Sequence, residues 1–336
     1  MLQYTLRRRR YKKDQLKNKE QSNPTTTYNP KFKYQNIPKI QFYTKEYMNE
    51  KHNESMEDII TIKKNFNNDP NKFLFCLFDG HCGNESAKFS SEKFPKIFQD
   101  SLKKNTNNIE KSLTESFLKL DELTKKIEDF LYIGNTATII YIDKNTIYSA
   151  NVGDSRSLLI GYDKPIRLTY DHKCSDESEK KRIIKAGGSI RNNRLNCDLA
   201  ISRAIGDNEY KKFGLIANPY ISKKNLSYNE KYCVIASDGI WDFVCDETVY
   251  NIGMMCDKGN EFCEKLINVA INVGSKDNIS CIVISFREWK KSIFISCIYY
   301  KLFINIAFWI MIEMIYLIWY LYFFLGFIFV IWYLYI

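Results

Sequence analysis

The chain has 336 residues, of which 45% are hydrophobic and 26% are charged, so it is long enough for one large domain with extensions. Its net charge of +10 is concentrated in residues 1–40, which contain 11 Lys or Arg and two acidic residues. The rest of the chain is almost neutral, which excludes a uniformly basic protein that coats nucleic acid. We therefore expect no nucleic-acid partner.

Residues 1–40 form a polar, basic arm that cannot bury enough apolar surface to fold alone, which predicts disorder. Its consecutive arginines, Arg7–Arg10, fit a nuclear-type signal, an attraction to anionic lipids or a solvated tail. No apolar segment follows them, so the start of the chain is not typical of a secretory signal. The ten cysteines include no Cys-x-x-Cys pair, which favours reduced thiols in an intracellular protein.

Residues 41–287 alternate between strand-like and helix-like patterns. The apolar run Phe73–Phe78 predicts a buried strand that ends at the turn pair Asp79-Gly80. Apolar residues at spacings of three and four from Ile109 to Phe130 predict an amphipathic helix. Further strands are predicted at 136–142, 146–151, 155–160, 232–236 and 279–286, and further helices at 246–256 and 261–273.

The three strands predicted between residues 136 and 160 are joined by very short connections, Asp143–Asn145 and Gly153-Asp154. Such connections join antiparallel neighbours, so we expect the three strands to pair in sequence. Clustered strands and separate helices indicate an α+β fold with antiparallel sheets rather than a doubly wound parallel sheet.

The C-terminal tail, residues 292–336, is strongly apolar, and Glu313 is the one charged residue from 302 onward. About 20 apolar residues are enough to span a bilayer, so the tail predicts a transmembrane anchor. Arg287, Lys290 and Lys291 precede it, which favours a cytosolic position for the preceding domain. Translation of a non-coding stretch of an AT-rich gene would give a similar composition, and the sequence leaves this alternative open.

Acidic residues stand at strand ends or tight turns in five segments: Glu57-Asp58, Asp79-Gly80, Asp154, Asp238 to Asp242, and Asp277. Asp79 and Asp238 each follow a buried strand, and two strands of one core can bring both carboxylates to the same edge. Gathered carboxylates repel one another unless cations neutralise them. Oxygen ligands without nitrogen suit Mg²⁺ or Mn²⁺, so the pattern predicts a hard-metal site of one or two ions.

Nine motifs occur in a recognisable order: Met56–Asp58, Phe78–His81, Gly134–Ala137, Asn151–Arg156, Leu168–Lys173, Arg182–Ile183 with Ala186–Gly188, Leu199–Asp207, Ala236–Asp242 and Asp277–Ser280. In order and spacing they resemble the motifs of the protein phosphatase 2C family. The resemblance implies a β-sandwich of two antiparallel sheets flanked by helices. It also implies metal-dependent hydrolysis of phosphoserine and phosphothreonine in proteins.

The resemblance further implies that Asp79 bridges two Mn²⁺ or Mg²⁺ ions. The other implied ligands, direct or through water, are Glu57, the carbonyl of Gly80, Asp238 and Asp277. The positions associated with a weaker third ion are Asp58, Asp154 and Asp242.

His81 matches the family's proposed general acid, which would protonate the departing seryl or threonyl oxygen. The alternative for His81 is a structural histidine at a turn. We expect His172 to be structural, His52 to be a solvated loop residue, and Arg203 and Asp207 to form a structural pair.

The chain departs from the family pattern at several positions. Asn53 stands where the family has an arginine that holds the substrate phosphate, and an amide cannot supply a charged, bidentate fork. Cys82 and Cys197 replace glycines, and Cys174 replaces a proline. We expect an active enzyme with a weakened or altered phosphate grip.

Two rival functions stay open. The first is a pseudophosphatase that binds phosphoproteins without turning them over, for which Asn53 is the sequence support. The second is a membrane-anchored scaffold in which the domain is incidental. For the phosphatase itself we expect phosphoprotein substrates, a monomer, and an intracellular location with an optional membrane anchor.

Overall fold

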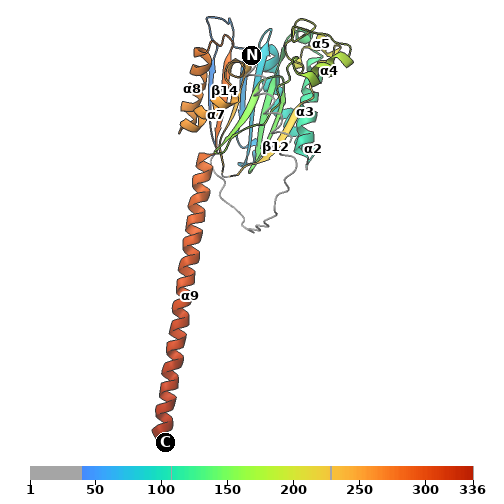
Figure 1. Ribbon diagram of the computed structural model, residues 1–336. Coiled ribbons are helices and arrows are strands. Elements are labelled where there is room, and N and C mark those ends of the chain that lie inside the picture. The colour runs from blue at the N-terminus through green and yellow to red at the C-terminus, as the bar shows by residue number, and fades with distance from the viewer. Residues whose placement is uncertain (1–39, 107, 228, 336) are drawn as a thin grey trace. The chain divides into compact units, whose positions relative to one another are not determined.

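Two antiparallel sheets face each other in the part of the chain that the computed structural model describes, residues 40–106, 108–227 and 229–335 (Figure 1). In spatial order, the first sheet contains β1 (Gln41–Tyr47), β14 (Ile279–Ser285), β13 (Glu230–Ala236), β7 (Arg156–Gly161) and β8 (Pro165–Arg167). The second contains β11 (Ile205–Gly206), β4 (Gly134–Asn135), β3 (Lys72–His81), β5 (Ala137–Asp143), β6 (Thr146–Val152) and β12 (Tyr220–Asn225), with β2 (Asp58–Lys63) also paired to β3.

The central strands are apolar on both faces because each face is covered. Phe73, Phe75 and Leu77 of β3 point into the core between the two sheets, together with Cys233 and Ile235 of β13. The alternate residues of β3, Leu74, Cys76 and Phe78, belong to a second core beneath a helical layer. A strand that is buried on both sides shows a continuous apolar run instead of alternation, which is the pattern seen in the sequence.

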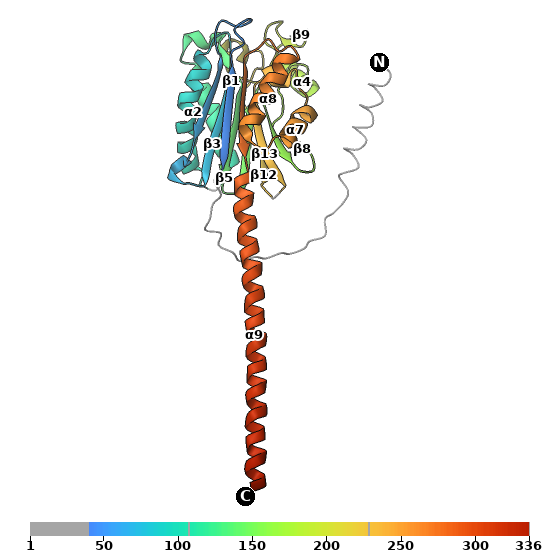
Figure 2. The ribbon, with the colours of Figure 1, turned by 90° about the vertical axis from the view of Figure 1, so that its left-hand side faces the viewer.

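One helical layer covers each sheet (Figure 2). The second sheet packs against α2 (Glu85–Lys104) and α3 (Ile109–Thr124), and the first against α7 (Asp246–Met255) and α8 (Gly259–Asn272). The remaining elements are η1 (Phe66–Asn68), η2 (Glu128–Leu131), α4 (Glu177–Lys185), β9 (Ile190–Arg191), β10 (Arg194–Leu195), α5 (Asn208–Lys211) and α6 (Asp238–Trp241). The α+β sandwich expected from the sequence is confirmed.

The pairing predicted for the strands between residues 136 and 160 is wrong at one connection. β5 and β6 are antiparallel neighbours, but β7 pairs with β13 and β8 in the other sheet. The turn at Gly153-Asp154 therefore crosses from one sheet to the other. A short connection can make this crossing because sheets stacked face to face lie only about 10 Å apart.

One helix prediction also needs correction, and one helix was missed. The helix predicted over 109–130 ends at Thr124, and a separate 3₁₀ turn, η2, follows it. Helix α2 was not predicted, because its buried face includes Ser86 and Ser90 and its interior contains Pro95, which together obscure the apolar periodicity. The helices predicted at 246–256 and 261–273 are confirmed as α7 and α8.

Helix α9 (Arg287–Tyr335) contains the C-terminal tail. Its segment Leu302–Val330 has a mean hydropathy of 2.0 over 29 residues, which makes it long and apolar enough to cross a bilayer. Length and composition alone meet that test, so the anchor stays a prediction. The basic arm, residues 1–40, lies almost wholly outside the described residues.

The cysteines whose side chains are described form no disulfides with one another. Cys76, Cys174, Cys233, Cys256, Cys263 and Cys281 are buried thiols, and Cys82, Cys197 and Cys245 are exposed thiols.

Candidate metal centre

The ends of β2 and β3 bring two carboxylates together. Asp58, the first residue of β2, is the direct cross-strand partner of Asp79, near the end of β3. The Asp79 carboxylate accepts a hydrogen bond from Ser155 Oγ at 3.0 Å. Asp58 is buried and accepts one from Ser237 Oγ at 2.8 Å. Ser237 directly follows β13 of the first sheet. Its hydrogen bond to Asp58 therefore links the two sheets beside the acids.

The first sheet supplies its acids at the same edge. Asp238 comes two residues after the last residue of β13, and Asp277 comes two residues before the first residue of β14. Because β13 and β14 are antiparallel partners, with Ala236 opposite Cys281, the end of one strand lies beside the start of the other. Two sequence segments 39 residues apart therefore place their carboxylates together.

Asp154 joins this edge through the crossing between the sheets. The preceding Gly153 has φ +93, and a Cβ on it would lie 2.5 Å from Thr136 Cγ2, so only glycine fits there. Asp154 is buried at the turn. The sequence predicted that Asp154 lies in a turn between two antiparallel neighbours, but the structure places it in a link between the two sheets.

Burial and mutual repulsion raise the pKa values of these acids. Burial, followed by the charges of Asp238, Asp58, Asp154 and Asp277, raises the pKa of Asp79 well above its ordinary value. Burial and the neighbouring acids do the same to the pKa of Asp238. Burial raises the pKa of Asp58 to about 7. Each carboxylate destabilises the ionised form of the others, so the cluster favours the approach of cations.

The donor set fits a hard divalent cation, since it offers carboxylate and backbone oxygens and no sulfur. Gly80 is buried next to Asp79, and a Cβ on it would lie 2.8 Å from the carbonyl oxygen of Glu57, so the backbone approach requires glycine. Within the described ranges, no three Asp, Glu, His or Cys side chains converge closely enough to enclose an ion directly. The arrangement suits ions that keep several water ligands, as Mg²⁺ does.

His81, the last residue of β3, is held by a carboxylate. Its Nε2 lies 2.7 Å from Oδ2 of Asp207, whose side chain is 1% exposed. Burial lowers the pKa of His81, but the charge and hydrogen bond of Asp207, together with the charges of Asp154 and Glu57, leave the pKa raised. Gly134 makes room for this pair, because a Cβ there would collide with the Asp207 carboxylate.

The expected pairing of Arg203 with Asp207 is wrong. Arg203 Nη2 instead lies 2.6 Å from Oε1 of Glu179, which also accepts from Ser202 and Arg182. Asp207 therefore pairs with His81 and not with Arg203. The sequence could not show this, because both acids were plausible partners and the pairing depends on where α4 packs.

Comparison with known proteins settles the family. The sequence pattern of the family described as Protein phosphatase 2C matches residues 45–279. The chain belongs to the protein phosphatase 2C family. Among its relatives, Protein phosphatase 2C homolog 1 of Saccharomyces cerevisiae is 31% identical over 261 residues, covering 71% of this chain and 91% of the yeast protein. Probable protein phosphatase 2C 6 of Paramecium tetraurelia is 34% identical over 256 residues, covering 66% of this chain and 85% of that protein.

Solved structures show the same fold. A serine-threonine phosphatase 2C from Toxoplasma gondii aligns with a TM-score of 0.65 at 18% identity, covering 74% of this chain and 96% of that one. A C. elegans sex determining protein aligns with a TM-score of 0.67 at 22% identity, covering 75% of this chain and 67% of that one.

Asn53 replaces the family's phosphate-docking arginine, and its side chain joins two loops by hydrogen bonds, an arrangement called here the asparagine clasp. Its Nδ2 donates to the carbonyls of Met48 at 3.1 Å and Lys276 at 2.9 Å. Asn278 adds a second link, because its Oδ1 accepts from the Glu57 backbone N–H at 2.7 Å. The clasp therefore holds the loop that carries Glu57 against the loop that carries Asp277.

Two other departures from the family keep a backbone conformation that favours glycine. Cys82 and Cys197 have φ values of 60° and 68°, in the left-handed region. For residues with a Cβ this conformation costs about 1–2 kcal/mol each. Both are exposed, so their side chains meet solvent rather than the core.

The two other histidines differ in their exposure. His172 is fully buried, and burial lowers its pKa to about 3, as suits a neutral structural residue. His52 is exposed in the loop after β1.

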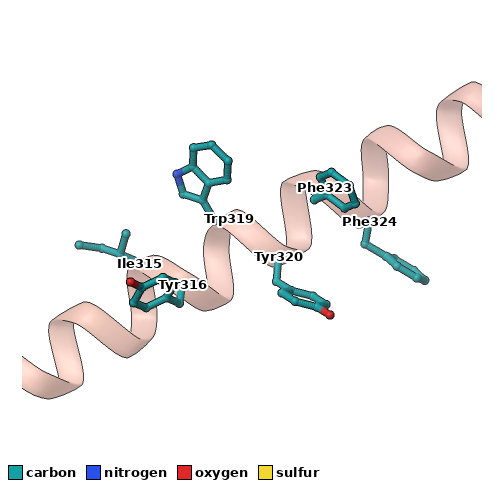
Figure 3. A pocket seen from close by; sticks show the side chains of 6 residues that line it. All are labelled: Ile315, Tyr316, Trp319, Tyr320, Phe323 and Phe324. Carbon is teal, nitrogen blue, oxygen red and sulfur yellow. The ribbon is translucent and has the colours of Figure 1, made fainter.

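A surface hollow on α9 is not a second ligand site. Ile315, Tyr316, Trp319, Tyr320, Phe323 and Phe324 line it. Figure 3 shows these side chains projecting from successive turns of one helix, so the hollow is the space between neighbouring side chains. A ligand pocket normally encloses most of its ligand's surface, which a single helix cannot do.

Proposed function

We propose that this chain hydrolyses phosphoserine and phosphothreonine in proteins, using a water molecule activated at a two-metal centre. As a member of the protein phosphatase 2C family, it is a protein serine/threonine phosphatase. The observation that carries the mechanistic proposal is the meeting of acids from both sheets around Asp79, whose ionised form their charges destabilise. Such a cluster is best explained by divalent cations that balance it.

The residues that would hold Mn²⁺ or Mg²⁺ are Asp79, Glu57, the carbonyl of Gly80, Asp238 and Asp277. When bound, the ions supply a water of lowered pKa and positive charge for the phosphoryl oxygens. Ser155 fixes one oxygen of the Asp79 carboxylate through its 3.0 Å hydrogen bond. The hydrogen bonds of Asn53 and Asn278 hold together the loops that carry Glu57 and Asp277.

His81 is proposed to donate the proton that the departing seryl or threonyl oxygen needs. Asp207 fixes the imidazole through Nε2, which leaves Nδ1 as the ring nitrogen that can reach the substrate. The charge of Asp207 also favours the protonated ring, which is the form that donates.

The test is a metal-dependent assay on the full chain with a phosphothreonine peptide. We expect turnover with Mn²⁺ or Mg²⁺, loss of turnover with a chelator, and recovery when the ion is returned. Binding of the phosphopeptide without turnover at saturating Mn²⁺ would instead identify a pseudophosphatase.

The phosphate grip is tested at Asn53. Asn53→Arg is expected to raise kcat/KM about tenfold, mainly through a lower KM, because a guanidinium holds phosphate with charged, paired hydrogen bonds. Asn53→Ala is the matched control, since it also breaks the clasp but adds no charge. If the arginine variant only matches the alanine variant, this position does not contact the substrate phosphate.

We also propose that the apolar segment Leu302–Val330 anchors the chain in a membrane, with the catalytic domain on the cytosolic side. Its 29 residues would extend for about 44 Å as a helix, against a hydrocarbon core of about 30 Å. Most of its described aromatic and aliphatic side chains are exposed, as they would be against lipid.

Carbonate extraction of cell membranes checks the anchor. The wild-type chain should stay in the membrane pellet, and the variant Leu317→Arg with Leu321→Arg should be released. Each arginine at mid-membrane costs about 2.5–3.5 kcal/mol. Phe303→Arg is the control, because a charge near the end of the segment can reach the interface. Equal release of all three chains would exclude a spanning helix.

A further inference from the structure

Lys173 lies between two of the acids that the sequence assigned to a third metal ion. Its Nζ is 3.2 Å from Oδ2 of Asp154 and 2.5 Å from Oδ1 of Asp242. Asp154 is buried, whereas the Asp242 side chain is 47% exposed. One ammonium group thus contacts a buried carboxylate and a partly exposed one at the same time.

The third acid of that predicted group has a different partner. Asp58 accepts its hydrogen bond from Ser237 Oγ at 2.8 Å. All three acids add negative charge beside Asp238, but it is Asp154 and Asp242 that pair with Lys173. The structure therefore divides the predicted third-ion set: one acid stands at the β2–β3 end, and the other two flank Lys173.

The lysine is fixed in place by its neighbours along the chain. His172 N–H donates to the carbonyl of Gly153 at 2.9 Å, and Cys174 N–H donates to that of Ala200 at 2.9 Å. Lys173 itself forms an isolated β-bridge with Ile201. Because the backbone on both sides is held, the side chain loses little additional freedom when it pairs with the acids.

We propose that Lys173 serves as a built-in cation for Asp154 and Asp242, and that it keeps a further divalent ion from binding there. The inference rests on the proposed two-metal function and limits the centre to two tightly bound ions. An ion that entered between these two carboxylates would have to displace an ammonium that already neutralises them. Without that ammonium, the pair offers two oxygen ligands next to Asp238, in a region of strong negative charge.

The test counts Mn²⁺ ions on the full chain by titration, with free Mn²⁺ followed by electron paramagnetic resonance. We expect two tight ions for the wild-type chain. Lys173→Met should bind a third, with an affinity at least tenfold higher than any third ion on the wild type. Lys173→Arg keeps the charge and should bind two.

A double variant guards against misfolding as an explanation. Lys173→Met with Asp242→Asn should return to two ions, because one of the two carboxylate ligands is gone. If Lys173→Met does not fold, Lys173→Gln takes its place in the same titration.

The outcomes separate this inference from the proposed function. Three tight ions on the wild type, or two on both Lys173→Met and Lys173→Gln, would overturn the role of Lys173 and leave the two-metal proposal standing. No Mn²⁺ binding to the wild type would overturn the proposed function itself.

Discussion

Replacing Asp79 with Asn is expected to abolish phosphatase activity and, at the same time, to stabilise the metal-free protein. Activity should fall roughly a thousandfold or more, equivalent to about 4 kcal/mol of transition-state stabilisation, because Asp79 would link both ions. Stability should rise because asparagine removes one charge from a cluster whose members repel one another. Asn can still accept the hydrogen bond from Ser155, so the local packing is kept.

Thermal unfolding in the presence of a chelator measures the second effect. The Asn variant should melt several degrees higher than the wild type, at about 2–4 °C for each kcal/mol. Added Mn²⁺ should raise the melting temperature of the wild type but not of the variant. Asp100→Asn, a change on the exposed surface of α2, should alter neither property. A variant that is inactive and also less stable without metal would show that Asp79 has a structural role instead.

Replacing His81 with Gln should lower kcat most for substrates whose leaving group needs a proton. On a phosphothreonine peptide we expect kcat to fall by about 10²–10⁴, the usual contribution of a general acid. On p-nitrophenyl phosphate the loss should be much smaller, because the departing phenolate is stable without a proton. Comparing kcat for the two substrates therefore separates proton donation from metal binding or folding.

Asp207→Asn is the companion variant, since it keeps the shape of the partner but removes its charge. It should show the same substrate dependence as His81→Gln, with a smaller loss, because the imidazole remains but is oriented less firmly. His52→Gln, in an exposed loop, is the control and should behave as the wild type. Equal losses on both substrates would mean that His81 does not act as the acid.

The sequence predicted several central strands and the main acids for a physical reason. Strands such as β3 and β13 are buried on both faces, so they appear as unbroken apolar runs, and the acids that follow them are easy to recognise. Helices α7 and α8 were recognised from the apolar residues that recur along one face. Helix α2 was not, because serines replace apolar residues on its buried face.

The contacts that complete the site could not be predicted in this way. Ser155, Ser237 and Lys173 are polar residues of ordinary appearance, and each matters because of the carboxylate that folding places beside it. The only available signal was their position inside motifs that already carried an acid. Asp207 was noticed but assigned to the wrong partner, since nothing in its spacing indicates His81.

The sequence by itself determined the composition of the centre: acids after buried strands, a glycine next to the central aspartate, and too few cations in the same motifs to balance them. It also determined the apolar tail, because length and hydropathy require no folding to be recognised. Only the tertiary structure decided how the acids are grouped, because β6 and β7 belong to different sheets and their turn carries Asp154 across the gap. Which sheet each strand joins depends on contacts between residues far apart in the sequence, and local residue patterns do not specify those contacts.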